Sequence, residues 1–119
     1  MLHAKIIDTS KNEKIKISKA EKFLNKSKFG AVIYFVGTVR DLNENKSVTG
    51  ITYDTKDSIV IRSFEEIYED ADNKLNIKDK AVFIEHVKGY VGLKEKSIII
   101  GVACKHRDQA FVLSRYIIE

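Results

Sequence analysis

The 119-residue sequence contains no proline, no tryptophan and only one cysteine, Cys104. A single cysteine excludes an internal disulfide framework and is too few for a zinc site built from cysteines. No apolar run approaches the roughly 18 residues that a membrane span needs, and the opening Met-Leu-His-Ala-Lys lacks the apolar centre of a signal peptide. We therefore expect a cytoplasmic protein that contacts no membrane and folds without disulfides.

Blocks of one charge are also missing. The 21 Lys and Arg residues are interleaved with 17 Asp and Glu residues, which leaves a net charge of +4 and a pI near 9.1. This balance favours anionic ligands, but it lacks the basic blocks of nucleic-acid-binding arms, so we expect no nucleic-acid partner. A chain of this length can bury roughly two-thirds of its unfolded surface in one core. Residues 1–119 are therefore expected to form one domain.

The hydrophobic pattern predicts strands interspersed with three helices. Strands are expected at 4–8, 31–37, 48–54, 81–87 and 97–104, and polar residues 41–47 are expected to form a mobile loop. Ser18 to Glu21 fits a capping box that opens a helix ending at Gly30, and a longer amphipathic helix is expected from Asp57 or Ser58 to Leu75. The last helix is expected from Asp108 onward. This order predicts an α+β fold in which helices cover a mixed or antiparallel sheet.

The segment from Gly30 to Asp41 contains the first candidate site. Ala31 to Val36 has the length and the aromatic and β-branched content of a buried strand, and Arg40 follows its end at Gly37. A guanidinium held there could bind a phosphate or carboxylate, with Gly37 allowing a ligand to approach the backbone. The alternative is an ordinary surface arginine after a core strand.

The segment from Cys104 to Asp108 contains the second candidate. His106 and Arg107 lie where a strand gives way to a helix, and helix N-termini attract anions. If the two strands are sheet neighbours, Arg40 and Arg107 are expected at the same edge, where they would form a phosphate clamp. His106 could transfer a proton near neutral pH, because the unperturbed pKa of histidine is about 6.5. The alternative for this pair is a capping histidine and an exposed arginine.

Other signals are weaker. His106-Arg107-Asp108 matches part of a kinase catalytic loop, but the downstream asparagine and the glycine-rich phosphate loop are missing. His3 and His86 have no ligand spacing, so we expect no metal site and no cofactor. Cys104 is either a small buried strand residue or a thiol whose pKa is lowered by its basic neighbours.

Together these segments resemble the large, catalytic subunit of molybdopterin synthase. The resemblance covers most of residues 30–119. It rests on Gly-Ala at 30–31, the run Phe-Val-Gly-Thr-Val-Arg-Asp at 35–41, the glycine-bearing loop after His86, and Gly-Val at 101–102 leading to His-Arg at 106–107 with Ala-Phe at 110–111.

The resemblance implies an α/β hammerhead fold and a homodimer of large subunits. A small ubiquitin-like subunit on each would complete a heterotetramer, and its thiocarboxylated Gly-Gly tail would enter the active site. The implied reaction is a sulfurtransferase reaction on cyclic pyranopterin monophosphate that builds the molybdopterin dithiolene. By the same resemblance Thr38, Val39, Arg40, His106 and Arg107 would line the substrate pocket.

The sequence departs from the family pattern at two places. The family's catalytic lysines follow the last helix, beyond the position of Glu119, so the resemblance assigns no catalytic residue here. The acidic and aromatic pattern after the second strand is reduced to Tyr53-Asp54-Thr55-Lys56. The alternative function is therefore a non-catalytic module that binds an anion or a ubiquitin-like tail. A small RNA-binding domain would rest only on the pI and on Tyr34 and Phe35.

Overall fold

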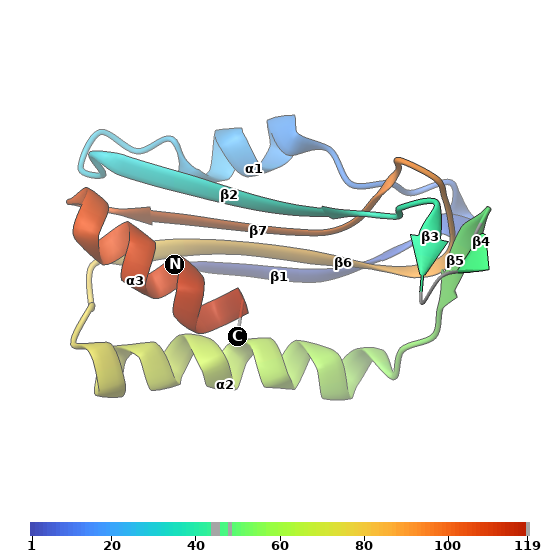
Figure 1. The fold of residues 1–119 in the computed structure, drawn as a ribbon. Helices are drawn as coiled ribbons and strands as arrows, with labels where there is room; N and C mark the ends of the chain where they lie inside the picture. Colours follow the sequence, from blue (N-terminus) through green and yellow to red (C-terminus); the bar gives the residue numbers. More distant parts are fainter. Residues whose placement is uncertain (44–45, 48, 119) are drawn as a thin grey trace.

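The computed structural model describes residues 1–43, 46–47 and 49–118. Within them the expected α+β fold is confirmed, with three α-helices and a mixed five-stranded sheet (Figure 1). The strands are β1 (Leu2–Asp8), β2 (Ala31–Thr38), β3 (Leu42–Asn43), β4 (Lys46–Ser47), β5 (Gly50–Tyr53), β6 (Lys80–Gly92) and β7 (Lys96–Cys104). The helices are α1 (Ile17–Leu24), α2 (Asp57–Leu75) and α3 (Arg107–Ile118), and a 3₁₀ turn, η1, covers Thr9–Lys11. None of the described helices is long and apolar enough to cross a membrane.

The main sheet has the strand order β1-β6-β7-β2. β1 runs parallel to β6, whereas β6 with β7 and β7 with β2 are antiparallel pairs. β5 pairs with the far end of β6, and β3 and β4 form a separate hairpin. The expected loop at 41–47 is therefore partly a hairpin, while its residues 44–45, like Val48 of the expected third strand, lie outside the described residues.

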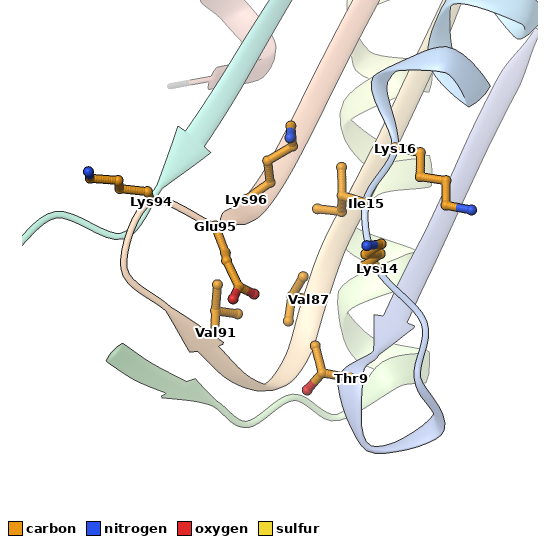
Figure 2. Close-up of a pocket in the computed structure, with 9 residues that line it drawn as sticks. All are labelled: Thr9, Lys14, Ile15, Lys16, Val87, Val91, Lys94, Glu95 and Lys96. Carbon is orange, nitrogen blue, oxygen red and sulfur yellow. The ribbon is translucent and has the colours of Figure 1, made fainter. Parts of the chain in front are cut away.

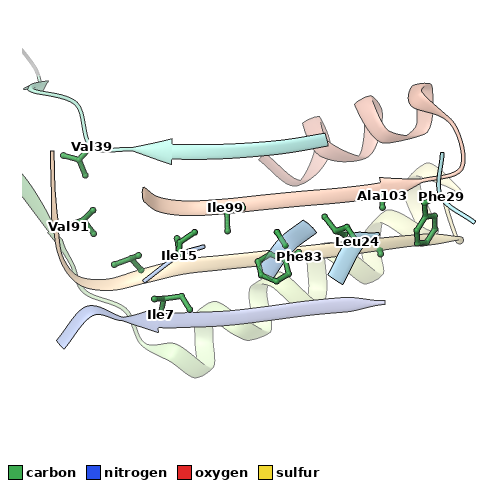
Figure 3. Close-up of a cluster of buried hydrophobic side chains, with 12 residues drawn as sticks. Ile7, Ile15, Leu24, Phe29, Val39, Phe83, Val91, Ile99 and Ala103 are labelled. Atoms are coloured by element: carbon green, nitrogen blue, oxygen red, sulfur yellow. The ribbon is translucent and has the colours of Figure 1, made fainter. Parts of the chain in front are cut away.

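Helices cover both faces of the sheet. α1 and the segment before it cover one face, where Ile15 and Leu24 pack with Phe83 and Ile99 (Figure 3). α2 and α3 cover the other face, where Ala71 and Leu113 pack with Val82 and Val102. Because successive strand residues point to opposite faces, β6 and β7 supply apolar side chains to both cores.

The buried strands are β6 and β7, and the expectation of a buried strand at 31–36 is wrong. β2 pairs only with β7 among the described residues, so it lies at an edge of the sheet. Val32, Tyr34 and Phe35 are 39%, 38% and 40% exposed. Apolar content alone does not distinguish a central strand from an edge strand.

The bounds of α1 and β6 also differ from the expected ones. α1 begins at Ile17 with Lys16 at its N-cap and no side-chain cap, so Ser18 and Glu21 do not form a capping box, and the helix ends at Leu24 rather than at Gly30. β6 continues through Gly92, which confines the turn before β7 to the short stretch around Lys94. Strand pairing with β5 extends β6, and this pairing is not visible in local sequence.

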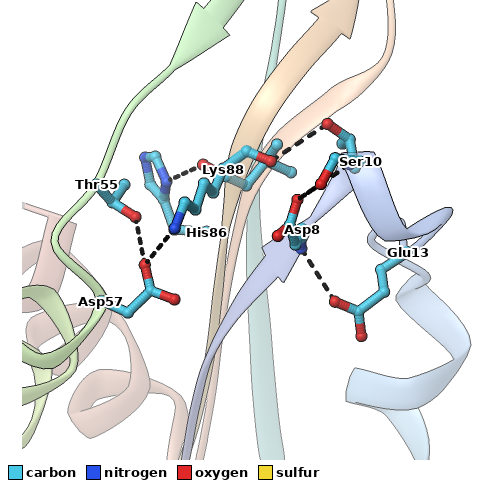
Figure 4. Close-up of polar contacts among 9 residues, drawn as sticks. Asp8, Ser10, Glu13, Thr55, Asp57, His86 and Lys88 are labelled. Carbon is cyan, nitrogen blue, oxygen red and sulfur yellow. Dashed lines mark hydrogen bonds and ion pairs between the residues drawn. The ribbon is translucent and has the colours of Figure 1, made fainter.

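Polar contacts join three elements at one end of the sheet (Figure 4). Lys88 on β6 pairs with Asp57 at the start of α2 (Nζ–Oδ1 3.4 Å), and the hydroxyl of Thr9 donates to the Lys88 carbonyl (3.2 Å). The backbone N–H of Asp8 donates to Glu13 Oε1 (3.1 Å), and this hydrogen bond lowers the pKa of Glu13. A hydrogen bond with the Ser10 side chain lowers the pKa of Asp8. These contacts fix the end of β1 against β6 and α2.

Candidate functional site: two cationic ends of the sheet

Arg40 lies just beyond the end of β2, on a segment held by the turn between β6 and β7. The N–H of Val39 donates to the carbonyl of Glu95 (3.2 Å), and the N–H of Lys94 donates to the carbonyl of Val39 (2.9 Å). The Val39 side chain is buried in the core, whereas Thr38 and Arg40 are exposed. Thr38 to Asp41 line a hollow of about 410 Å³ together with Leu93 and Lys94.

His106 and Arg107 lie where β7 gives way to α3. Arg107 is the first residue of α3, and the His106 carbonyl accepts from the N–H of Ala110 (3.2 Å). Both side chains are exposed, and the structure shows no ion pair for either within the described residues. Arg107 therefore places a guanidinium at the positive end of the α3 dipole, a setting that attracts anions.

The structure does not bring these two segments together within one chain. β2 and β7 are sheet neighbours, as expected, but they are antiparallel: Ala31 lies opposite Cys104, and Thr38 lies opposite Lys96. The end of β2 and the end of β7 are therefore separated by seven residue steps, or about 23 Å at about 3.3 Å per residue. The expectation that Arg40 and Arg107 leave the same edge is wrong, because antiparallel neighbours end at opposite sides of a sheet.

Lysines that the sequence analysis did not single out increase the positive charge at the Arg40 end. A hollow of about 520 Å³ lies between the segment after η1 and the β6–β7 turn (Figure 2). Its lining includes Lys14, Lys16, Lys94 and Lys96, with Glu95 as the carboxylate. In Figure 2 the ammonium groups of Lys16, Lys94 and Lys96 point in different directions. The hollow thus adds diffuse positive charge rather than a convergent anion site.

Cys104 is a core residue, the first of the two sequence interpretations. The side chain is fully buried on the face covered by α2 and α3. Burial raises the pKa of the Cys104 thiol to about 11, an effect that outweighs the opposing influence of Lys80. Because the nucleophilic form of cysteine is the thiolate, Cys104 is not placed to act as a nucleophile.

Gly30 fixes the position of the His106 and Arg107 segment against the start of β2. A β-carbon placed on Gly30 would lie 2.7 Å from the backbone carbonyl oxygen of Lys105. Asp79 anchors the same junction through ion pairs with Lys28 (3.2 Å) and Lys105 (3.3 Å), contacts that lower the Asp79 pKa. The start of β2 and the start of α3 are therefore a single packed unit.

Gly30→Ala is expected to lower the free energy of unfolding by about 1 to 3 kcal/mol, because a backbone carbonyl must move to admit the new methyl group. Chemical denaturation measures this change. Gly92→Ala is the matched control, since the nearest atom to its added carbon is a carboxylate oxygen of the flexible Glu95 side chain at 3.2 Å. If the two variants lose the same free energy of unfolding, the contact with the Lys105 carbonyl is not the reason that residue 30 must be glycine.

Solved structures share this fold. The structure aligns with molybdopterin synthase from Staphylococcus aureus at a TM-score of 0.83, with 21% identity over 95% of this chain and 78% of that one. The MoaE protein from Burkholderia ambifaria gives a TM-score of 0.80, with 22% identity over 99% and 74%. A complex of subunits 1 and 2 of molybdopterin-converting factor from Helicobacter pylori gives 0.74, with 23% identity over 97% and 74%. The α+β architecture of this chain is thus a fold found among molybdopterin-biosynthesis proteins.

Sequence comparison then places the chain in one family. Residues 10–119 match the MoaE protein family, so the chain belongs to that family. Two molybdopterin synthase catalytic subunits are similar to it: that of Synechococcus elongatus is 32% identical over 88% of this chain, and that of Thermoplasma volcanium is 38% identical over 76%. This chain spans 63% and 64% of the length of those two relatives.

Proposed function

We propose that this chain is the large subunit of a molybdopterin synthase. In this role it holds cyclic pyranopterin monophosphate while sulfur is transferred from the thiocarboxylated tail of a small ubiquitin-like subunit, which builds the dithiolene. The observation that carries the proposal is the family match over residues 10–119. The proposal includes one domain over residues 1–119 and a location in the cytoplasm.

The substrate carries a phosphate, and the two exposed arginine segments provide the chemistry to bind it. A guanidinium can donate two parallel hydrogen bonds to a phosphate, and such charge-assisted bonds are about twice as strong as neutral ones. Arg107 adds this donor pair to the α3 N-terminus, and His106 is placed beside it to give or accept a proton. Thr38, Val39 and Arg40 form the other wall of the proposed pocket.

The antiparallel pairing of β2 and β7 means that one chain cannot supply both walls. The proposed pocket therefore needs two copies of the chain, with Thr38 to Arg40 from one and His106 and Arg107 from the other. This requirement agrees with the homodimer implied by the family. Each homodimer would then contain two pockets, and a small subunit at each would complete a heterotetramer.

The proposed small subunit would approach the Arg40 end of the sheet. Among the described residues, the lining of the hollow there includes four lysines, Lys14, Lys16, Lys94 and Lys96, and one carboxylate, that of Glu95. Such an excess of positive charge attracts an acidic partner and speeds its association at low salt. The relative from Helicobacter pylori was solved as a complex of two subunits.

Two measurements test the proposal. Titration with cyclic pyranopterin monophosphate should show saturable binding that weakens as salt is raised, and adding thiocarboxylated small subunit should then yield the dithiolene product. Substrate binding without product in the presence of thiocarboxylated small subunit would favour the alternative, a non-catalytic module that binds the anion or the ubiquitin-like tail. Failure to bind either the substrate or the small subunit would contradict both functions.

A further inference from the structure

We infer that Lys94 is a binding residue for the small subunit, whose tail ends in an anionic group that the Lys94 ammonium holds beside Arg40. The inference deepens the proposed function and rests on it, because it names a residue that receives the tail. It concerns a lysine in the turn between β6 and β7 and not the family's lysines, which follow the last helix.

Lys94 has a backbone conformation that lysine rarely adopts. Its φ is +66°, in the left-handed region, and the other two non-glycine residues with positive φ in the described part of the chain are both asparagines. The N–H of Glu95 donates to the carbonyl of Gly92 (3.2 Å), so Lys94 is the third residue of a tight turn, a position that favours glycine or asparagine when φ is positive. Residues held in such disfavoured conformations cluster at functional sites.

The turn fixes Lys94 against the segment that carries Arg40. The N–H of Lys94 donates to the carbonyl of Val39 (2.9 Å), and the carbonyl of Glu95 accepts from the N–H of Val39 (3.2 Å). Two backbone hydrogen bonds therefore join the turn to the residue immediately before Arg40. A glycine at position 94 would keep both bonds and suit the backbone better, so the fold alone does not require a lysine here.

Lys94 lies between two hollows. It lines the lysine-rich hollow of about 520 Å³ and the hollow of about 410 Å³ at Arg40, and none of the other described lining residues belongs to both. In Figure 2 its ammonium points away from Lys14 and Lys16, on the side where the chain leaves β2. A small subunit drawn to the lysine-rich hollow would therefore extend its tail past Lys94 to reach Arg40.

The hollow at Arg40 has the charge and the surface that the end of such a tail needs. Arg40 and Lys94 contribute two positive charges to its lining and Asp41 one negative charge, and the structure shows no ion pair for either cation within the described residues. The resulting charge of +1 complements a single carboxylate or thiocarboxylate. Leu93, which is 37% exposed, adds an apolar wall for the backbone of the tail.

Lys94→Gly separates a structural role from a binding role. Glycine suits the left-handed backbone, so the variant should unfold at a temperature about 3 to 6 °C higher than the parent in scanning calorimetry. The variant also lacks the ammonium, so isothermal titration should show about tenfold weaker binding of the small subunit with a free terminal carboxylate. A residue with only a structural role would not combine a more stable fold with weaker binding.

Matched variants control for strain and for charge. Asn76→Gly changes another left-handed residue, at the end of α2, without changing the charge, and Lys74→Ala removes an exposed lysine from the same helix. Both should leave the affinity nearly unchanged, and Lys94→Arg, which keeps the charge, should retain most of it. A small subunit without its two terminal glycines should bind the parent and Lys94→Gly equally, because its tail no longer reaches the turn.

The outcomes distinguish the inference from the proposed function. Equal affinity of the parent and Lys94→Gly for the complete small subunit would overturn the inference and leave the proposed function intact. An equally large loss of affinity for cyclic pyranopterin monophosphate would also overturn it, since Lys94 would then hold the phosphate. A parent protein that binds neither the small subunit nor the substrate would contradict the proposed function, and the inference with it.

Discussion

Replacing Arg107 with alanine is expected to weaken the proposed binding of cyclic pyranopterin monophosphate by about ten- to a hundredfold. A charge-assisted hydrogen bond contributes about 1.5 to 3 kcal/mol, and each 1.4 kcal/mol is a factor of ten in affinity. Arg107 is exposed, and the structure shows no ion pair for it within the described residues, so its loss should disturb the fold little. Isothermal titration at fixed ionic strength measures the change.

Two further variants separate geometry from charge. Arg107→Lys keeps the positive charge but loses the planar pair of donors, so its affinity should fall between those of the parent and Arg107→Ala. Arg62→Ala removes the same charge from α2, where the arginine pairs with Glu66 (3.4 Å), and should leave binding nearly unchanged. Equal losses for Arg62→Ala and Arg107→Ala would show that only net charge matters and that α3 holds no phosphate.

Replacing His3 with alanine is expected to lower the free energy of unfolding by about 1 to 3 kcal/mol, the range for leaving a buried polar group without its hydrogen-bond partner. The Glu85 carboxylate is fully buried, and its Oε2 lies 2.8 Å from His3 Nε2. Lys19 is farther away, at 3.6 Å, and Oε1 has no hydrogen-bond partner among the described residues. His3 is 30% exposed, which lowers the expected loss.

The His3 ring also packs on Phe83, with centroids 4.3 Å apart and an 11° interplanar angle, so the contribution of stacking must be separated from that of the hydrogen bond to Glu85. His3→Phe keeps an aromatic ring, and the difference between it and His3→Ala measures the stacking. Glu85→Gln removes the carboxyl group that contacts His3 Nε2, so His3→Ala should cost much less in that background. An equal loss in both backgrounds, measured by urea denaturation, would show that His3 does not compensate Glu85.

The sequence was sufficient to predict the parts of the fold set by local pattern. The apolar spacing of α2 predicted its bounds, because four of its apolar residues, Phe64, Ile67, Ala71 and Leu75, face the core. This feature depends on residues close to one another in sequence.

The direction and the position of β2 in the sheet could not be predicted. Ala31 to Thr38 has the composition of a buried strand, yet its place at the edge depends on pairing with β7, some seventy residues along the chain. The same long-range pairing decides that Arg40 and Arg107 lie at opposite ends of one chain. The sequence placed Arg40 and the pair His106 and Arg107 after the ends of strands, as the structure does, but it did not show that these ends lie at opposite sides of the sheet.

Complementation between inactive variants is the most direct test of a pocket shared by two copies. Arg40→Ala and Arg107→Ala are each expected to bind cyclic pyranopterin monophosphate poorly. If the pocket is shared, a mixed dimer contains one intact pocket and one that lacks both arginines. Unfolding and refolding an equimolar mixture should then restore about a quarter of the parent binding capacity, because half of the dimers are mixed and each has one good pocket of two. Recovery near this level with the affinity of the parent protein is the predicted result, and a mixture that binds no better than its components would contradict the shared pocket.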